Sequence, residues 1–135
     1  MKKILYIFVV LLVSVTAIAC GKEKKPVSNN NNKATEVKSD LIVIDRTVDE
    51  FQFTNASLIV DDNSSTFKVL VTNTSENPVD IKKVVIKFYD NESHVIASLD
   101  GMILGTIDSK ETKMVSASHY EKLDKAYSLG YEIVK

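Results

Sequence analysis

Cys20 is the residue whose type and position point most directly to chemistry. It is the only cysteine in the chain of 135 residues, so it cannot form an internal disulfide. A thiol can take a covalent group once it is activated, and a single unpaired cysteine in an exported protein calls for such an explanation. The residues that precede Cys20 indicate which modification to expect.

The first nineteen residues have the layout of an export signal. Lys2 and Lys3 form a positively charged start, and Ile4 to Val13 is an apolar stretch. That stretch is too short to span a bilayer comfortably, but it has the length of the apolar region of a signal peptide. Residues 1–19 are therefore predicted to be a signal peptide.

The end of this signal, Ser14 to Gly21, resembles the lipobox of bacterial lipoproteins. In a lipobox, small residues precede a cysteine that receives a diacylglycerol group and becomes the first residue of the mature chain. Ala17 stands where that family more often has Leu. The resemblance implies an extracytoplasmic protein that is held at the bacterial cell membrane by acyl chains, such as palmitate, attached through Cys20. An ordinary secretory signal cleaved near Ala19, or an uncleaved anchor, is the alternative.

Residues 20–40 are predicted to be the lipidated cysteine and a flexible linker. The stretch from Gly21 to Asp40 is polar and rich in Asn and Lys, and it offers nothing from which to build a core. A flexible chain of about twenty residues has a root-mean-square reach of roughly 25 Å. Lysines near the cysteine could contact anionic lipid headgroups, although a solvated tether explains them equally well.

Residues 41–135 are predicted to form one domain whose apolar residues alternate with polar ones. This period-two pattern is typical of β-strands, and turn-forming clusters separate its segments. The pattern starts with a β-branched run and predicts an inward-facing core. The strand segments are Leu41–Asp45, Phe51–Val60, Phe67–Val71, Val84–Phe88, Val95–Leu99, Thr112–Ser118 and Tyr127–Ile133; the predicted core residues are Val69, Val84, Ile86, Phe88, Leu129 and Tyr131.

One segment departs from period two. Tyr120, Leu123 and Tyr127 are spaced three and four residues apart with charged residues between them, which favours one or two helical turns. The remaining pattern leaves no room for the long crossovers that parallel strands need. The chain is therefore predicted to be all-β, a single antiparallel β-sandwich of about seven strands.

Three segments of the predicted domain resemble motifs of the FxLYD-type domain and its immunoglobulin-like relatives, which occur in small bacterial lipoproteins. The matching segments are Val71-Thr72-Asn73-Thr74-Ser75, Val84 to Asp90, and Val95-Ile96. Ile107 to Glu111 stands at a later family turn but lacks its Pro and Gly. The resemblance spans residues 60 to 135 and implies an immunoglobulin-like sandwich in the cell envelope. It implies no activity, and Asn73, Phe88 and Asp90 also have purely structural explanations.

The residues that could catalyse a reaction or bind a metal do not form a recognised pattern. His94 and His119 are the two histidines, fewer than a zinc site usually uses. The loops Asp61-Asp62-Asn63 and Asp90-Asn91-Glu92 are rich in oxygen ligands but lack a known calcium spacing. The chain has no Gly-x-Ser-x-Gly elbow and no glycine-rich phosphate loop. We therefore expect no enzyme, no cofactor and no metal; calcium binding at the acidic loops stays open.

The charge balance bears on which classes of partner to expect. The chain has 17 basic and 18 acidic residues, so it lacks the basic footprint of a nucleic-acid-binding protein. We expect a non-catalytic interaction module of the cell envelope that binds an envelope protein or a wall polymer. The alternatives are an accessory or structural lipoprotein that docks through a sheet edge, and a small hydrolase or metal-binding protein.

The candidate binding surface is one outer strand face. If Val84, Ile86 and Phe88 point inward, then the residues between them point outward and form a row of two lysines, a valine and a tyrosine. Tyrosine is enriched at recognition surfaces, and the lysines could meet acidic groups. A lysine-bearing outer face also simply keeps a sheet soluble. The row consists of Lys83, Val85, Lys87 and Tyr89.

Overall fold

The strands follow the apolar alternation. The computed structural model describes residues 34–103 and 105–135. Six longer strands carry the sandwich, and the shorter elements lie between them. In chain order the elements are β1 (Thr35–Glu36), α2 (Asp40–Val43), β2 (Arg46–Val48), β3 (Phe51–Val60), β4 (Ser65–Asn73), β5 (Val79–Asp80), β6 (Lys83–Tyr89), β7 (Val95–Met102), β8 (Thr106–Ile107), β9 (Thr112–His119) and β10 (Ser128–Val134).

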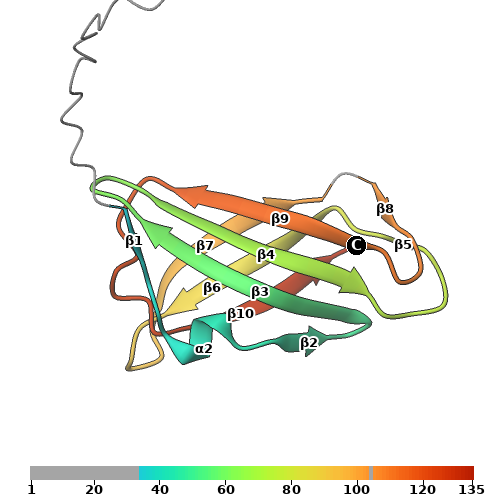
Figure 1. Cartoon of the computed structure of the whole chain (residues 1–135), viewed down its shortest axis with the longest axis horizontal. Coiled ribbons are helices and arrows are strands. Elements are labelled where there is room, and N and C mark those ends of the chain that lie inside the picture. Colours follow the sequence, from blue (N-terminus) through green and yellow to red (C-terminus); the bar gives the residue numbers. More distant parts are fainter. Residues whose placement is uncertain (1–33, 104) are drawn as a thin grey trace, which may run out of the picture. The chain divides into compact units, whose positions relative to one another are not determined.

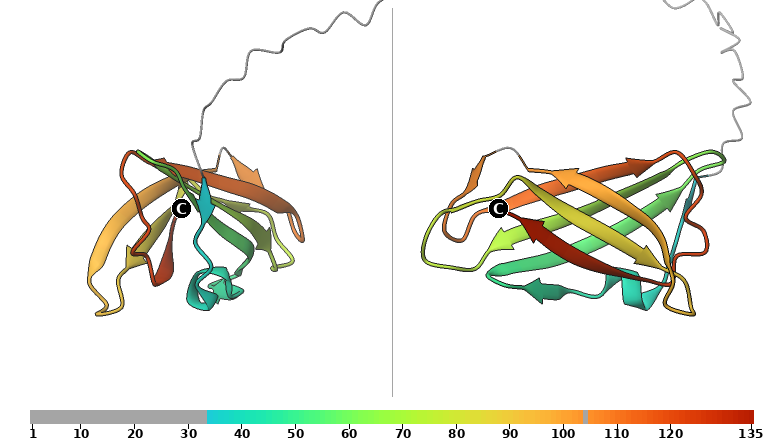
Figure 2. Two further views of the ribbon diagram at one scale, coloured as in Figure 1. Left: turned by 60° about the vertical axis from the view of Figure 1, so that its left-hand side comes forward. Right: turned by 180° about the vertical axis from the view of Figure 1, so that it is seen from behind.

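Two antiparallel sheets pack face to face in this part of the chain (Figures 1 and 2). One sheet has the order β1-β3-β4-β9, with β2 also paired to β3, and the other has the order β10-β6-β7. A short β5-β8 pair closes one end. All pairings are antiparallel, so the predicted all-β antiparallel sandwich is confirmed.

The chain changes sheet three times, as Greek-key sandwiches do. It leaves the first sheet after β4, returns to it at β9, and crosses again to reach β10. The hairpins β3-β4 and β6-β7 stay within one sheet each. This connectivity brings β6, from the middle of the sequence, between two strands that are distant from each other along the chain.

A β-bulge in β3 shifts the alternation by one residue. Phe51 and Phe53 are buried before the bulge, and Ala56 and Leu58 are buried after it. The pairing of β3 with β4 shifts between Thr54 and Ser57, and Asn55 has a φ of 53°. An extra residue in the left-handed region is the usual way a strand absorbs such a shift, and it lets both halves of β3 face the core.

The core joins the two sheets through aromatic rings. Phe67 on β4 meets Phe88 on β6 edge-to-face, with ring centroids 5.3 Å apart. Phe53 on β3 stacks on Tyr131 of β10 at 4.0 Å. Such pairs add to the free energy gained by burying the rings. The contacts fix how the two sheets face each other.

Five of the six predicted core residues are confirmed as buried. Val69, Val84, Ile86, Phe88 and Leu129 are buried. Tyr131 is half-buried and packs against the core rather than lying within it. Its ring lies on Phe53 while the strand runs near the sheet edge, which explains the intermediate exposure.

Two local predictions were wrong. The β-branched run Leu41–Asp45 is not extended, because Asp40–Val43 forms the single-turn helix α2. The segment from Tyr120 to Tyr127 has no helix, and its 3-4 spacing does not mark a buried face: Tyr120 is exposed. Of the three spaced residues only Leu123 is buried, together with Ala126. The Ala126 N–H donates to the Leu123 carbonyl and closes a turn between them.

The first sheet already includes residues before the predicted domain start at Leu41. Thr35 and Glu36 pair with Val60 and Ile59 of β3, and the Val37 N–H donates to the Leu58 carbonyl. The last residues of the expected linker therefore belong to the sheet. The predicted signal peptide, Cys20 and most of that linker lie outside the described residues.

Phe88→Ala tests the central contact. Phe88 is fully buried and meets Phe67 across the sheets, so its truncation is expected to lower the free energy of unfolding by about 3–5 kcal/mol. Chemical denaturation of the two proteins measures this. A loss of less than about 1 kcal/mol in a folded variant would contradict the assignment, because surface substitutions usually fall in that range.

Candidate functional site

The predicted binding row lies on the outer face of the β10-β6-β7 sheet. Val84, Ile86 and Phe88 are buried, and the alternate residues of β6 are half-exposed. The orientation follows from the period of two along a strand. The structure therefore puts Lys83, Val85, Lys87 and Tyr89 on one surface, as the sequence indicated.

The two lysines of this row are already paired. The Lys83 ammonium lies 2.6 Å from Asp100 on β7, and the Lys87 ammonium lies 2.8 Å from Glu132 on β10. Asp100 and Glu132 flank Val85 in the register, so each lysine reaches its carboxylate diagonally. The hydrogen bond to Glu132 raises the pKa of Lys87 and lowers that of Glu132. The middle of this face is thus a charge-balanced surface.

Tyr89 is the last residue of β6, two positions beyond Lys87 on the same face. Its strand position pairs with Ser128 on one side and with Val95 on the other. Its carbonyl accepts a hydrogen bond from the Tyr127 N–H at 2.9 Å. The ring lies over Gly130, where a Cβ atom would be 3.6 Å from its Cε2, an ordinary van der Waals contact.

Exposed apolar side chains lie on the segments that Tyr89 contacts, Val95 as its strand partner and Tyr127 through a backbone hydrogen bond. Ile44 is 52%, Tyr127 is 50% and Val95 is 58% exposed. The Ser39 hydroxyl donates to the Tyr127 carbonyl at 2.6 Å and so ties α2 to the start of β10. We call this surface the end strip; it comprises Leu41, Val43, Ile44, Tyr89, Val95 and Tyr127.

Helix α2 positions half of the end strip. A helix of one turn can point few side chains inward, and here Ile42 alone is buried. The Arg46 guanidinium donates to the Leu41 carbonyl at 2.8 Å and holds the turn in place. Ile42 anchors the turn, so its neighbours Leu41 and Val43 are left facing outward.

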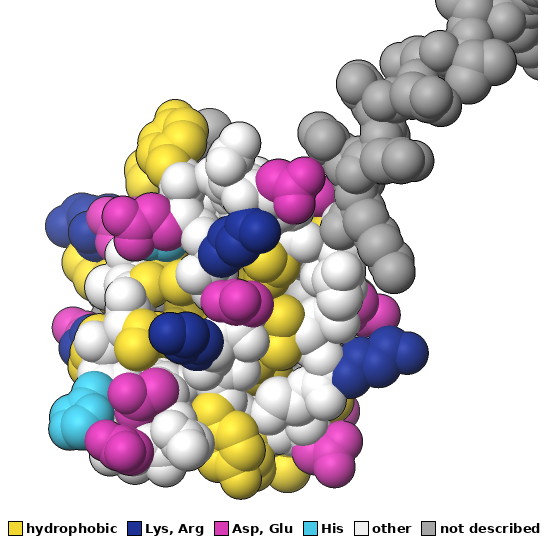
Figure 3. Space-filling view, turned by 90° about the vertical axis from the view of Figure 1, so that its left-hand side faces the viewer, with side chains coloured by type: hydrophobic (Ala, Val, Ile, Leu, Met, Phe, Trp, Pro, Cys, Tyr) yellow, Lys and Arg dark blue, Asp and Glu magenta, His cyan; other side chains and the backbone are white. Residues whose placement is uncertain are grey.

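A shallow hollow lies within the end strip, between α2 and Tyr127. It has a volume of about 540 Å³ and is lined by Lys38, Ser39, Asp40, Leu41 and Tyr127. Seen from the end where this helix lies, hydrophobic side chains sit among charged ones (Figure 3). Such a hollow is large enough for an apolar side chain of a partner.

The histidines and acidic loops make local contacts. His94 Nδ1 lies 3.4 Å from Asp90 Oδ2 and 3.6 Å from a Glu92 oxygen. Asp90 also accepts the backbone N–H groups of Glu92 and His94, which lowers the pKa of its carboxyl. In residues 34–103 and 105–135, no group of three or more His, Cys, Asp or Glu residues could hold a metal ion. The Asp90 loop is a hairpin turn built on its own side chain.

Asn73 and Tyr131 have structural environments. The buried Asn73 amide donates to the Asn77 and Ile107 carbonyls, and its oxygen accepts two hydrogen bonds from Ser75. Burial raises the pKa of Tyr131, so its phenol stays neutral at physiological pH. Neither group is set up to donate or accept protons in a reaction.

The comparisons with known proteins give no relative. No protein-family model, no curated protein and no solved structure matches the chain. Within the described residues, no helix has the length and apolar character needed to cross a membrane.

Half of the end strip was missed at the level of sequence. Leu41 to Ile44 is a run of four large aliphatic residues between Asp40 and Asp45, and such a run on a surface is a signal of an interaction site. Its β-branched composition instead favoured a buried strand. Tyr127 was expected to begin the last strand, yet it lies just before β10 begins.

The Lys87–Glu132 pair gives a measurable pH dependence. Glu132 is expected to titrate below its ordinary pKa of 4.5, so the pair stabilises the fold above that pH and loses its effect as pH falls through the lowered value. Lys87→Met should raise the Glu132 pKa, as NMR titration of the carboxyl carbon would show. Lys83→Met, whose lysine pairs with Asp100, should raise it less; equal shifts would contradict the pairing.

Proposed function

We propose that this protein is a membrane-anchored envelope lipoprotein whose β-sandwich is a non-catalytic interaction module, with the end strip as its contact surface. The observation that carries the proposal is the group of exposed apolar and aromatic side chains at or next to α2, β6, β7 and the start of β10, segments that the Ser39–Tyr127 and Tyr127–Tyr89 hydrogen bonds bring together. Soluble proteins rarely expose such a group unless it contacts something.

The anchor is proposed from the residues before Cys20. A lone cysteine preceded by Ala19 and followed by Gly21 is what lipid attachment requires. The described domain starts at Thr35, so about fifteen residues separate its first strand from that cysteine.

Binding is favoured over catalysis by what surrounds the titratable groups. Lys83 and Lys87 are in ion pairs on an open face, and the His94 contacts belong to a hairpin. An enzyme needs a nucleophile or an acid–base pair held in a cleft. At the end strip, by contrast, apolar side chains remain exposed to water, and covering them would be favourable in free energy.

Docking through a sheet edge is less well supported. β7 and β9 are edge strands of the two sheets, and they run side by side along one seam (Figures 1 and 2). The Gly101 backbone lies directly against the Val115 side chain there. The two edges therefore approach each other, which leaves less room for an added strand.

Cys20→Ala tests the anchor. The variant is expected to lose incorporation of a fatty-acid analogue and to leave the membrane fraction or to accumulate as precursor, because the thiol is the only site for the lipid. Metabolic labelling and fractionation measure both. Ser14→Ala, which keeps the cysteine, is the control. Label that persists in Cys20→Ala would refute the anchor.

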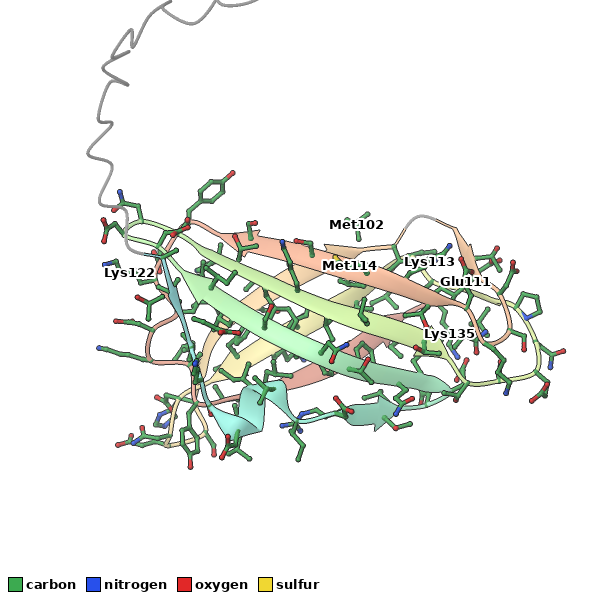
Figure 4. All side chains as sticks on the ribbon, viewed as in Figure 1. Met102, Glu111, Lys113, Met114, Lys122 and Lys135 are labelled. Atoms are coloured by element: carbon green, nitrogen blue, oxygen red, sulfur yellow. The ribbon has the colours of Figure 1, made fainter. Side chains whose placement is uncertain are left out.

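Tyr127→Ser combined with Ile44→Ser tests the contact surface. The double variant is expected to lose the proteins or wall polymer that co-purify with the tagged full chain from envelope extracts. Both side chains are exposed, so the melting temperature should change little. Met114→Ser is the matched control, because Met114 is 65% exposed and lies on β9, away from α2 (Figure 4). Equal recovery with all three proteins would contradict the proposal.

A further inference from the structure

Two methionines supply the sulfur of the described domain. The chain has three methionines and one cysteine, and Met1 and Cys20 lie outside the described residues. In the part of the chain that the structure describes, sulfur is therefore confined to Met102 on β7 and Met114 on β9. The chain also has no tryptophan. These two thioethers are thus the side chains of the domain that a peroxide is expected to oxidise first.

Strand alternation turns both methionines toward solvent. On β7, Gly101 is buried and Met102 follows it, so the Met102 side chain points to the opposite face. On β9, Val115 is buried and Met114 precedes it, with the same result. Met102 is 61% and Met114 is 65% exposed, and Figure 4 labels both on these strands. A small oxidant can reach either sulfur without any opening of the fold.

The contact between the two strands lies on the inner side of these methionines. A Cβ atom added at Gly101 would collide with Val115 Cγ1, so the backbone of β7 lies directly against the Val115 side chain. Met102 and Met114 are each one residue away from this contact and face away from it. An oxygen atom added to either sulfur therefore enters water and does not disturb the packing of the seam.

The buried core is insensitive to the same reaction. In residues 34–103 and 105–135, the buried hydrophobic side chains are those of Phe, Leu, Ile, Val and Ala. Oxidation of a buried methionine puts a polar sulfoxide into a core and disrupts it. Within the described residues the core holds no thioether, so oxidation of this domain is separated from its unfolding.

We propose that Met102 and Met114 form a surface oxidation site, at which each sulfur takes up one oxygen atom from hydrogen peroxide while the sandwich stays folded. A sulfur lone pair attacks one peroxide oxygen, the S–O bond forms as the O–O bond breaks, and the proton of the attacked hydroxyl group passes to the leaving oxygen, which departs as water. The sulfur loses two electrons and the peroxide gains two. This site lies outside the end strip and does not depend on the proposed function.

Oxidation of the purified full chain with hydrogen peroxide tests the site. Peptide mapping by mass spectrometry counts the oxygen atoms on each residue, so that a thioether on Cys20 is scored separately. Met102 and Met114 are each expected to become sulfoxides, at rates within about threefold of their rates in the chain unfolded by guanidinium chloride. The doubly oxidised protein should melt within a few degrees of the untreated one.

The conservative variants are the matched controls. Met102→Leu and Met114→Leu keep the apolar bulk; each should remove one oxygen atom from the domain, and the double variant should take up none there. Protection of either methionine by more than about tenfold in the folded chain would show that its sulfur is covered and would overturn the site. A melting temperature lowered by more than about 5 °C after double oxidation would also overturn it, because a thioether would then be part of the packing.

Discussion

The edge-to-face contact between Phe67 and Phe88 is the interaction on which the rest of the structure depends. It joins the central strands β4 and β6 of two sheets that share no backbone hydrogen bonds. The inward rows of both strands line up around it because each strand alternates with a period of two. With these rows fixed, every other residue of β6 must face solvent.

This constraint leads to two different outer surfaces. On the middle of the β10-β6-β7 sheet, outward lysines meet outward carboxylates across the register, and the face is balanced in charge. At the end of the same sheet these ion pairs stop, and the Tyr89 carbonyl accepts a hydrogen bond from the Tyr127 N–H, just before β10 begins. The proposed contact surface thus lies where the strand ladder ends.

The bulge at Asn55 shows how much a single residue can decide. Without the extra residue, Ala56, Leu58 and Val60 would face away from the core, because a shift by one reverses every side chain. The left-handed backbone at Asn55 restores the inward face. The end of β3 after the bulge pairs with β1, so that the sheet includes Thr35 and Glu36.

The sequence by itself determined the all-β architecture and the facing of the central strands. Phe67, Val69, Val84, Ile86 and Phe88 alternate regularly, and that local pattern is set by strand geometry alone. The turn at Asn73 could also be predicted from the sequence, because hydrogen bonds of its side chain go to residues two and four positions away along the chain.

Tertiary structure decided the features that depend on contacts between distant segments. Lys83 and Lys87 could be placed outward from sequence, but their partners Asp100 and Glu132 come from strands whose register no local pattern reveals. Leu41–Asp45 has the composition of a strand, and propensity is a weak guide where packing chooses otherwise. The end strip exists because residues far apart in sequence meet there: Ser39 bonds to Tyr127, and Tyr127 bonds to Tyr89.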